Sequence, residues 1–164
     1  MIEKDDQYWM QQALLFAQQA ADIDEIPVGA IVVKDNKIIG SGFNQPISLC
    51  DPTAHAEIQA LRHAAKHIGN YRLNGAVLYV TLEPCGMCAG AIVHSRIARL
   101  VYGATEPKAG VIVSQTQQLD KDYLNHKVLY QGGVCADACS AIISAFFTRR
   151  RAEKVKGKPG SSYV

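Results

Sequence analysis

The segment TLEPCGMCAGA, residues 81–91, carries two cysteines three positions apart. Cys85 and Cys88 follow a proline at the end of an apolar run, residues 76–81, which is typical of a β-strand. A Cys-x-x-Cys pair occurs in zinc sites, in redox centres and in ordinary cores, so the spacing alone leaves all three open. A choice among them requires further ligands elsewhere in the chain.

A second segment, DPTAHAEIQAL, supplies candidate partners. We expect a helix that begins at Asp51 as its N-cap, which places His55 and Glu57 near the helix start. Cys85 and Cys88 begin another short helix, where the helix dipole favours the thiolate form. Positions 55 and 57 lie about 200° apart around a helix, so their side chains can converge only beyond its N-terminal end.

The three residues His55, Cys85 and Cys88 form a ligand set suited to zinc. Structural zinc sites are closed by four protein ligands, whereas three ligands leave a position open, as catalytic sites do. Two thiolates neutralise the formal charge of Zn²⁺, so a bound water would be less acidified than in a three-histidine site and would need a proton carrier. We therefore expect one zinc per chain, with Glu57 as the catalytic residue and not a ligand.

The remaining sequence predicts the elements that must position these residues. Stretches with helical spacing alternate with apolar runs, which indicates a layered α/β domain, and one hairpin adds antiparallel pairing. We expect helices over residues 7–21, 51–68 and 85–94 and from about 134 onward, and strands over residues 27–33, 37–43, 76–82, 96–103 and 128–130.

Length and composition favour one globular domain. The chain has 164 residues, of which 48% are hydrophobic and 20% charged, which suits a folded core. We expect one domain over residues 1–156 and a disordered tail over residues 157–164. No apolar run approaches a membrane span, and the first residues do not resemble a signal peptide. We therefore expect a cytoplasmic protein, without membrane contact, whose five cysteines stay reduced.

Positive charge is concentrated near the end of the chain. Residues 149–158 hold six Lys or Arg and one Glu, a local charge of +5 in a chain of net charge +2, which leaves about −3 for the rest. This segment either contacts an anionic partner such as nucleic acid or is a solvated tail, and charge alone favours the tail.

Two further pairs at helical spacing could suggest metal binding. Cys135 and Cys139 share a predicted helix face with Phe146, so we expect them to pack in the core. His63 and His67 lie opposite the apolar stripe of their helix, and we expect them to face solvent.

The combination of H-A-E with P-C-x-x-C matches the signature of zinc deaminases. Beyond this signature the chain resembles the bacterial tRNA adenosine deaminase family from residue 7 to about residue 155. The segments that carry the resemblance are EIPVGAIVV, FNQP, DPTAHAEIQALR, NYRL, LYVTLEPCGMCAGAIVHSRI and FFTRRR, in that order.

The resemblance implies a three-layer cytidine-deaminase-like fold, with a mixed five-stranded sheet between helices. It implies a homodimer that converts adenosine to inosine at the wobble position of a tRNA anticodon, chiefly in an arginine tRNA. A zinc-activated water would attack C6 of the adenine while Glu57 protonates N1, and ammonia would leave. The alternatives are a deaminase of free bases or nucleotides, of guanine or cytosine type, and a non-catalytic RNA-binding protein.

The resemblance also assigns substrate contacts. Asn44 would hydrogen-bond the flipped base, with Pro27 and Val28 near the pocket wall. The last helix would approach the anticodon stem-loop of the tRNA, through Phe147, Arg149, Arg150 and Arg151. The sequence departs from the family in one loop that borders the RNA: residues 103–106 read Gly-Ala-Thr-Glu where Gly-Ala-Arg-Asp is usual, and residues 111–113 are larger.

Overall fold

The computed structural model describes residues 4–157. The predicted disordered tail, residues 157–164, lies outside this range except for Gly157. One five-stranded sheet has the order β2-β1-β3-β4-β5, in which β1 is antiparallel to both neighbours and β3, β4 and β5 run parallel. The elements are α1 (Asp6–Asp22), β1 (Gly29–Lys34), β2 (Lys37–Phe43), α2 (Ala56–Ile68), β3 (Val77–Leu82), α3 (Gly86–His94), β4 (Arg99–Ala104), a 3₁₀ turn (Gln118–Asp120), β5 (Leu129–Gln131) and α4 (Ala136–Val155).

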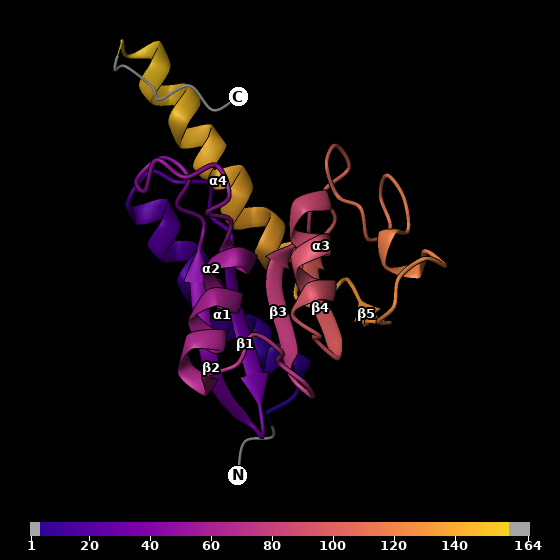
Figure 1. Ribbon diagram of the computed structural model, residues 1–164. Helices are drawn as coiled ribbons and strands as arrows, with labels where there is room; N and C mark the ends of the chain where they lie inside the picture. Colours follow the sequence, from indigo (N-terminus) through magenta and orange to yellow (C-terminus); the bar gives the residue numbers. More distant parts are fainter. Residues whose placement is uncertain (1–3, 158–164) are drawn as a thin grey trace.

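The sheet lies between two helical layers, as the sequence predicts. Helices α2 and α3 cover one face, and α1 covers the other together with the first part of α4, whose later turns extend beyond the body (Figure 1). Side chains of successive strand residues point to opposite faces. Accordingly, Leu78 and Leu100 pack beneath α2 and α3, whereas Ile31, Tyr79 and Val101 pack against α1 and α4. The mixed three-layer architecture is confirmed.

Helix α2 begins later than the sequence predicts. The Asp51 carboxylate accepts hydrogen bonds from the backbone N–H and the hydroxyl of Thr53, at 2.8 and 2.7 Å, and so closes a local turn in place of capping a helix. The helix starts at Ala56, and His55 occupies the N-cap with extended backbone angles (φ −71°, ψ 155°). The predicted start at residue 51 is therefore wrong by about one turn of helix.

The apolar stripe of α2 only partly faces the core. The buried positions on this helix include Ala60 and Ala64, which are fully buried, and Leu61. Ile58 and Ala65 instead line an open groove between α2 and α3, which Leu61 also borders. Part of this apolar stripe therefore forms an apolar surface between two helices. Among residues 4–157, no helix is long and apolar enough to cross a membrane.

Candidate active site

Two helix N-termini meet on the same face of the sheet. Cys85 is the N-cap of α3, with extended backbone angles (φ −80°, ψ 177°), and its side chain, like that of His55 at the N-cap of α2, makes no capping hydrogen bond. Both side chains are consequently directed away from their own helices and toward each other. Cys88, one turn into α3, is fully buried beside them.

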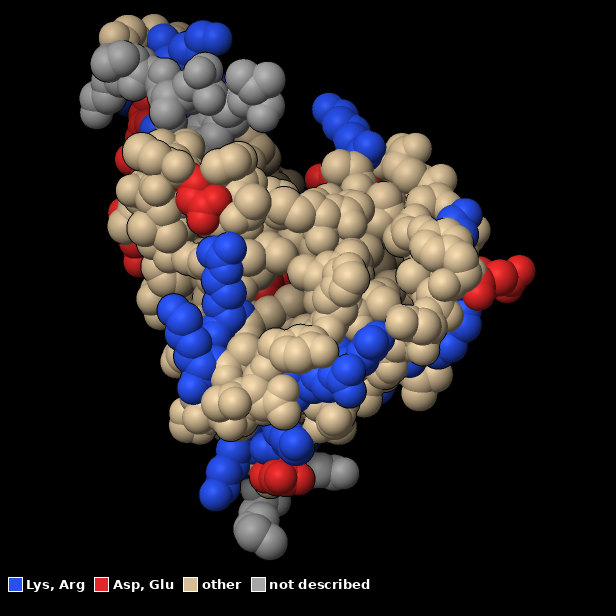
Figure 2. All heavy atoms as spheres, viewed as in Figure 1, with Lys and Arg blue, Asp and Glu red and all other residues tan. Residues whose placement is uncertain are grey.

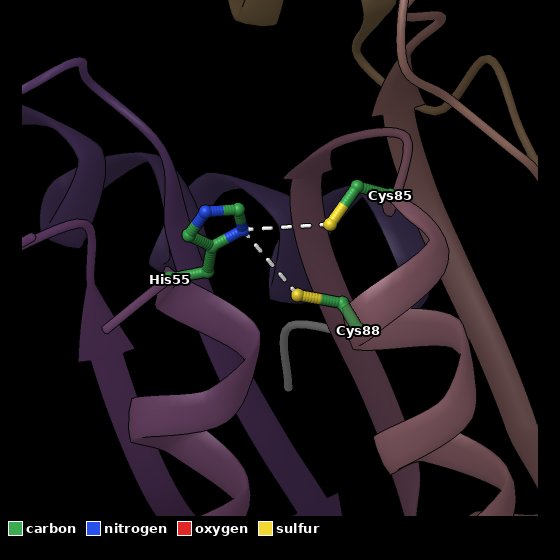
Figure 3. A group of neighbouring side chains, drawn as sticks. All are labelled: His55, Cys85 and Cys88. Atoms are coloured by element: carbon green, nitrogen blue, oxygen red, sulfur yellow. Dashed lines mark hydrogen bonds between the residues drawn. The ribbon is translucent and has the colours of Figure 1, made fainter. Parts of the chain in front are cut away.

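Nδ1 of His55 faces both sulfur atoms (Figure 3), at 3.6 Å from Cys85 Sγ and 3.5 Å from Cys88 Sγ. All three candidate ligand atoms lie within 4.8 Å of one another. Zinc distances of about 2.3 Å to sulfur and about 2.0–2.1 Å to nitrogen place two vertices of a tetrahedron about 3.6 Å apart. The spacing of the nitrogen and the sulfurs therefore fits a tetrahedral metal centre.

The polar environment of the group favours a thiolate. A hydrogen bond with Cys88, supported by His55, lowers the pKa of Cys85 to about 3. The same hydrogen bond and burial raise the pKa of Cys88. The contact with Cys85 raises the pKa of His55. A soft anionic ligand is thus held at the start of α3, where the helix dipole also stabilises negative charge.

Glu57 lies in the first turn of α2 and is only 4% exposed. Burial raises the pKa of its carboxyl group, against opposing contributions from hydrogen bonding to its own backbone and from His55. Glu57 is not one of the three residues whose ligand atoms cluster, although its carboxylate shares a hydrogen bond with Cys88. A buried carboxyl group beside, and not within, the candidate metal centre is suited to carrying protons.

A cavity of about 230 Å³ opens onto this group. Of the substrate residues predicted from the sequence, Val28, Asn44 and Phe147 line it, whereas Pro27 is buried outside the lining. The polar and charged lining is completed by two acidic residues, Glu83 and Glu106. The full lining is Ile26, Val28, Asn44, His55, Glu57, Leu82, Glu83, Cys85, Glu106, Ala109, Ile143 and Phe147.

Two buried carboxylates are absent from the sequence predictions: Glu83, which lines the cavity, and Glu25, which precedes the lining residue Ile26 in the chain. Glu25, 1% exposed, accepts hydrogen bonds from the backbone of Ile47 and from both the backbone and the hydroxyl of Ser48. Glu83, 3% exposed, binds the backbone of the loop over residues 106–114. Burial opposes ionisation of Glu83, but these hydrogen bonds hold its pKa below the usual range. Glu83 could have been identified from the sequence, because it is a charged residue that ends an apolar strand and directly precedes Pro84.

The arginines of the basic end lie outside the cavity lining. Arg149 forms ion pairs with Asp24 at 2.9 Å and with Glu153 at 3.1 Å. Arg150 pairs with the same two acidic residues, at 3.8 and 3.3 Å. Arg151 is exposed and donates to Thr148 of its own helix. Lys and Arg side chains also occupy several other parts of the face that carries α2 and α3 (Figure 2).

The other pairs at helical spacing behave as predicted. Cys139 is buried in the core against α1 and the sheet, and Cys135 packs beside it. His63 and His67 are exposed, and Nδ1 of His63 accepts a hydrogen bond from the backbone N–H of Ser41. Among residues 4–157, His55, Cys85 and Cys88 form the one group placed to hold a metal ion.

Comparison with known proteins agrees with this geometry. The family model described as MafB19-like deaminase matches residues 4–151. The tRNA-specific adenosine deaminase of Haemophilus influenzae is 53% identical over 150 residues, which cover 91% of this chain and 87% of that protein. The protein of the same name from Bacillus subtilis is 39% identical over 149 residues, which cover 91% of this chain and 92% of that one.

Solved structures show the same architecture. A protein from a study of A-to-I editing by tRNA:A34 deaminases superposes with a TM-score of 0.80 at 41% identity, covering 82% of this chain and 98% of the other. A guanine deaminase from Nitrosomonas europaea superposes with a TM-score of 0.76 at 20% identity, over 90% of this chain and 87% of the other, and so shares the fold. The fold and the His/Cys/Cys group define a deaminase with the cytidine-deaminase-like fold. Within that class, the chain belongs to the tRNA-specific adenosine deaminase family.

Proposed function

We propose that this protein hydrolyses adenosine to inosine at the wobble position of a tRNA anticodon, chiefly in an arginine tRNA, and releases ammonia. The observation that carries the proposal is the buried Glu57 beside the tetrahedrally spaced His55, Cys85 and Cys88, at a cavity that Asn44 also lines. The names of the relatives supply the substrate class.

The proposed cofactor is one zinc ion per chain, held by His55 Nδ1 and the two cysteine sulfurs. When bound, zinc would supply Lewis acidity that makes a water molecule a better nucleophile. Glu57 accepts the proton of the attacking water and delivers it to N1 of the adenine. The Glu57 carboxylate then takes the second proton, from the hydroxyl group now attached to C6, and delivers it to the exocyclic nitrogen. The bond between C6 and that nitrogen breaks, a carbonyl group forms at C6, and ammonia leaves.

Different residues of the cavity wall would make the polar and the apolar contacts with the base. Deaminases that act on nucleic acids take the target nucleotide out of its stack and read it in a closed pocket. Asn44 supplies an amide that can pair with the polar edge of the purine, and Val28 and Phe147 supply apolar contacts to its faces. Pro27 is buried next to the lining residue Val28 in the chain and does not itself line the cavity, so its proposed role is to position the wall and not to touch the base.

The decisive experiment uses an arginine tRNA transcript with adenosine at the wobble position. After incubation with the protein, sequencing should show inosine at that position alone. Free adenosine, guanine and cytosine are assayed in parallel. Deamination of a free base or nucleoside, with the tRNA unchanged, would favour the alternative class of enzyme.

The metal assignment is tested separately. Cys85→Ser and Cys88→Ser should both lose most of their bound zinc and their turnover, because each removes a thiolate ligand. Cys50→Ser is the matched control, since Cys50 is exposed and outside the ligand group. Metal analysis that finds full zinc in either ligand variant, with wild-type activity, would refute the assignment.

The proposal extends to assembly and location. A homodimer is proposed from the family resemblance, and the open apolar groove between α2 and α3 is the surface that a second copy would cover. Residues 1–156 are proposed to act as one deaminase domain. A cytoplasmic location is proposed from the tRNA substrate, and the proposed partners are the anticodon stem-loop and the second subunit.

A further inference from the structure

Glu83 lies between the candidate metal centre and the loop that walls the cavity. It follows β3 and precedes Cys85 by two residues, and its backbone N–H donates to Ala104 of β4 at 2.8 Å. Its side chain lines the cavity, yet the residue as a whole is only 3% exposed. The carboxylate is therefore directed into the protein next to the site, and not into solvent.

Hydrogen bonds from the loop over residues 106–114 occupy all acceptor sites of the Glu83 carboxylate. Oε2 accepts the backbone N–H groups of Ile112, Val113 and Ser114 at 3.0, 2.9 and 3.0 Å. Oε1 accepts the backbone N–H of Glu106 at 3.0 Å and the hydroxyl of Ser114. A carboxylate offers about four lone-pair sites, so five donors leave none for a substrate. Glu83 is thus placed to hold protein and not to react.

The loop held in this way forms part of the cavity wall. Glu106 and Ala109 both line the cavity. Val111 adds a hydrogen bond from its N–H to the carbonyl oxygen of Pro84, at 3.0 Å, which ties the loop to the turn that carries Cys85. A Cβ on Gly110 would collide with the Glu83 carboxyl group, so the loop can approach this closely only with glycine there.

We propose that Glu83 is a positioning residue that holds residues 106–114 as a wall of the substrate cavity and thereby sets how tightly the nucleic-acid substrate binds. This role rests on the proposed function. The wall contacts the substrate before and during the reaction, so its loss weakens both states alike and raises KM with a smaller effect on kcat.

The test is Glu83→Gln. The amide keeps one acceptor oxygen but turns an NH₂ group toward N–H donors, so it cannot replace the carboxylate. We expect KM for the tRNA transcript to rise roughly tenfold with kcat changed less, because bonds to a charged acceptor are lost. Bound zinc should be unchanged. Hydrogen exchange should rise at residues 106–114 and stay unchanged in β3.

Ser114→Ala tests the same contact with less risk to folding, because it removes one donor and keeps the carboxylate. Its changes in exchange and KM should be smaller and in the same direction. Ser48→Ala is the matched control: it removes the hydroxyl that donates to the other buried carboxylate, Glu25, and should leave exchange at residues 106–114 unchanged.

The outcomes distinguish a failure of the role proposed for Glu83 from a failure of the proposed deaminase function. Unchanged hydrogen exchange at residues 106–114 in both Glu83→Gln and Ser114→Ala would refute the proposal that Glu83 holds this loop in place. Raised exchange with unchanged KM would refute the role in substrate binding, while leaving the deaminase function intact. Wild-type protein that does not edit tRNA would overturn the proposed function itself, and with it the role of the wall.

Discussion

At the scale of single residues, the proposed chemistry requires Glu57 near the candidate metal centre without being one of its ligands. Glu57 is 4% exposed, and burial raises the pKa of its carboxyl group, so less free energy is needed to protonate it than to protonate an exposed glutamate. The ligand atoms that cluster belong to His55, Cys85 and Cys88. At the start of α2, the proposed proton carrier Glu57 is thus two residues from the candidate ligand His55, while the other two candidate ligands lie on α3.

Glu57→Gln should keep the fold and the bound zinc and lose roughly 10²–10⁴-fold in turnover, because the amide fills the same volume but cannot carry protons. Single-turnover editing of the tRNA transcript and metal analysis together test this. Loss of zinc in Glu57→Gln would identify Glu57 as a ligand. Retained turnover would mean that another group moves the proton.

The site residues differ in how visible they are in the sequence. His55 and the two cysteines are recognisable because metal ligation would restrict residue type and spacing, and Glu57 is recognisable because it shares the H-A-E motif with His55. Glu25 and Glu83 are much less visible, because most of their partners are backbone N–H groups, which almost any residue can supply. Their role depends on where a distant loop lies, and that is a property of the fold.

At the scale of elements, the strands and helices follow from periodicity, while their ends depend on local hydrogen bonds. The sequence places the start of α2 too early, because the Asp51 carboxylate accepts hydrogen bonds from Thr53 and closes a local turn in place of capping the helix. The later start matters for function. As an N-cap with extended backbone, His55 is freed from the angular spacing of the helix, so it can face the sulfurs while Glu57 remains on α2.

Helix α1 is anchored to the sheet by Asp6, at its first residue. Asp6 accepts hydrogen bonds from both terminal nitrogens of Arg99, at 2.9 and 2.7 Å, and from the Tyr79 hydroxyl at 2.8 Å. The bonds from Arg99, against a smaller effect of burial, lower the pKa of Asp6 from its ordinary value of 3.8. This network lies on the face opposite α2 and α3, so it can be changed without touching the metal centre.

Asp6→Asn should lower the free energy of unfolding by about 1–2 kcal/mol near neutral pH, because bonds to a charged acceptor are weakened. Since the folded pKa of Asp6 lies below the unfolded one, its contribution is full above the unfolded pKa and is lost as pH falls through the folded pKa. Urea unfolding near pH 7 and near pH 2 should show the difference from wild type shrinking in acid. Exposed Asp122→Asn is the control. An equal difference at both pH values would contradict the assignment.

At the scale of the whole molecule, the groove between α2 and α3 should be covered in a homodimer. Ile58→Glu places a charge in this groove and should shift the protein toward monomer, since an unpaired charge is costly to bury. Leu15→Glu is the matched control, because Leu15 on α1 is 60% exposed on the opposite face. Sedimentation of both variants is the measurement. A wild-type protein that is monomeric and fully active would reject the dimer.

The basic end of the chain is the last feature that acts across the molecule. The family resemblance, with the local excess of positive charge, assigns Arg149, Arg150 and Arg151 to the tRNA. Replacing all three by Gln should weaken binding and flatten its salt dependence by about 0.7–0.9 per lost contact. In the structure, however, two of these arginines already form ion pairs within the protein. Asp24 pairs with Arg149 at 2.9 Å and with Arg150 at 3.8 Å. An intramolecular carboxylate therefore competes with phosphates for these guanidinium groups.

Asp24→Asn should accordingly strengthen tRNA binding and steepen its salt dependence, with bound zinc unchanged. The substitution suits the backbone, since Asp24 has a φ of 61° and Asn adopts this left-handed region readily. Asp122→Asn makes the same change in net charge far from the basic helix and controls for charge alone. Binding is measured over a series of salt concentrations. If the two variants gain equally, the ion pair with Asp24 does not compete with RNA, and only the overall charge of the protein matters.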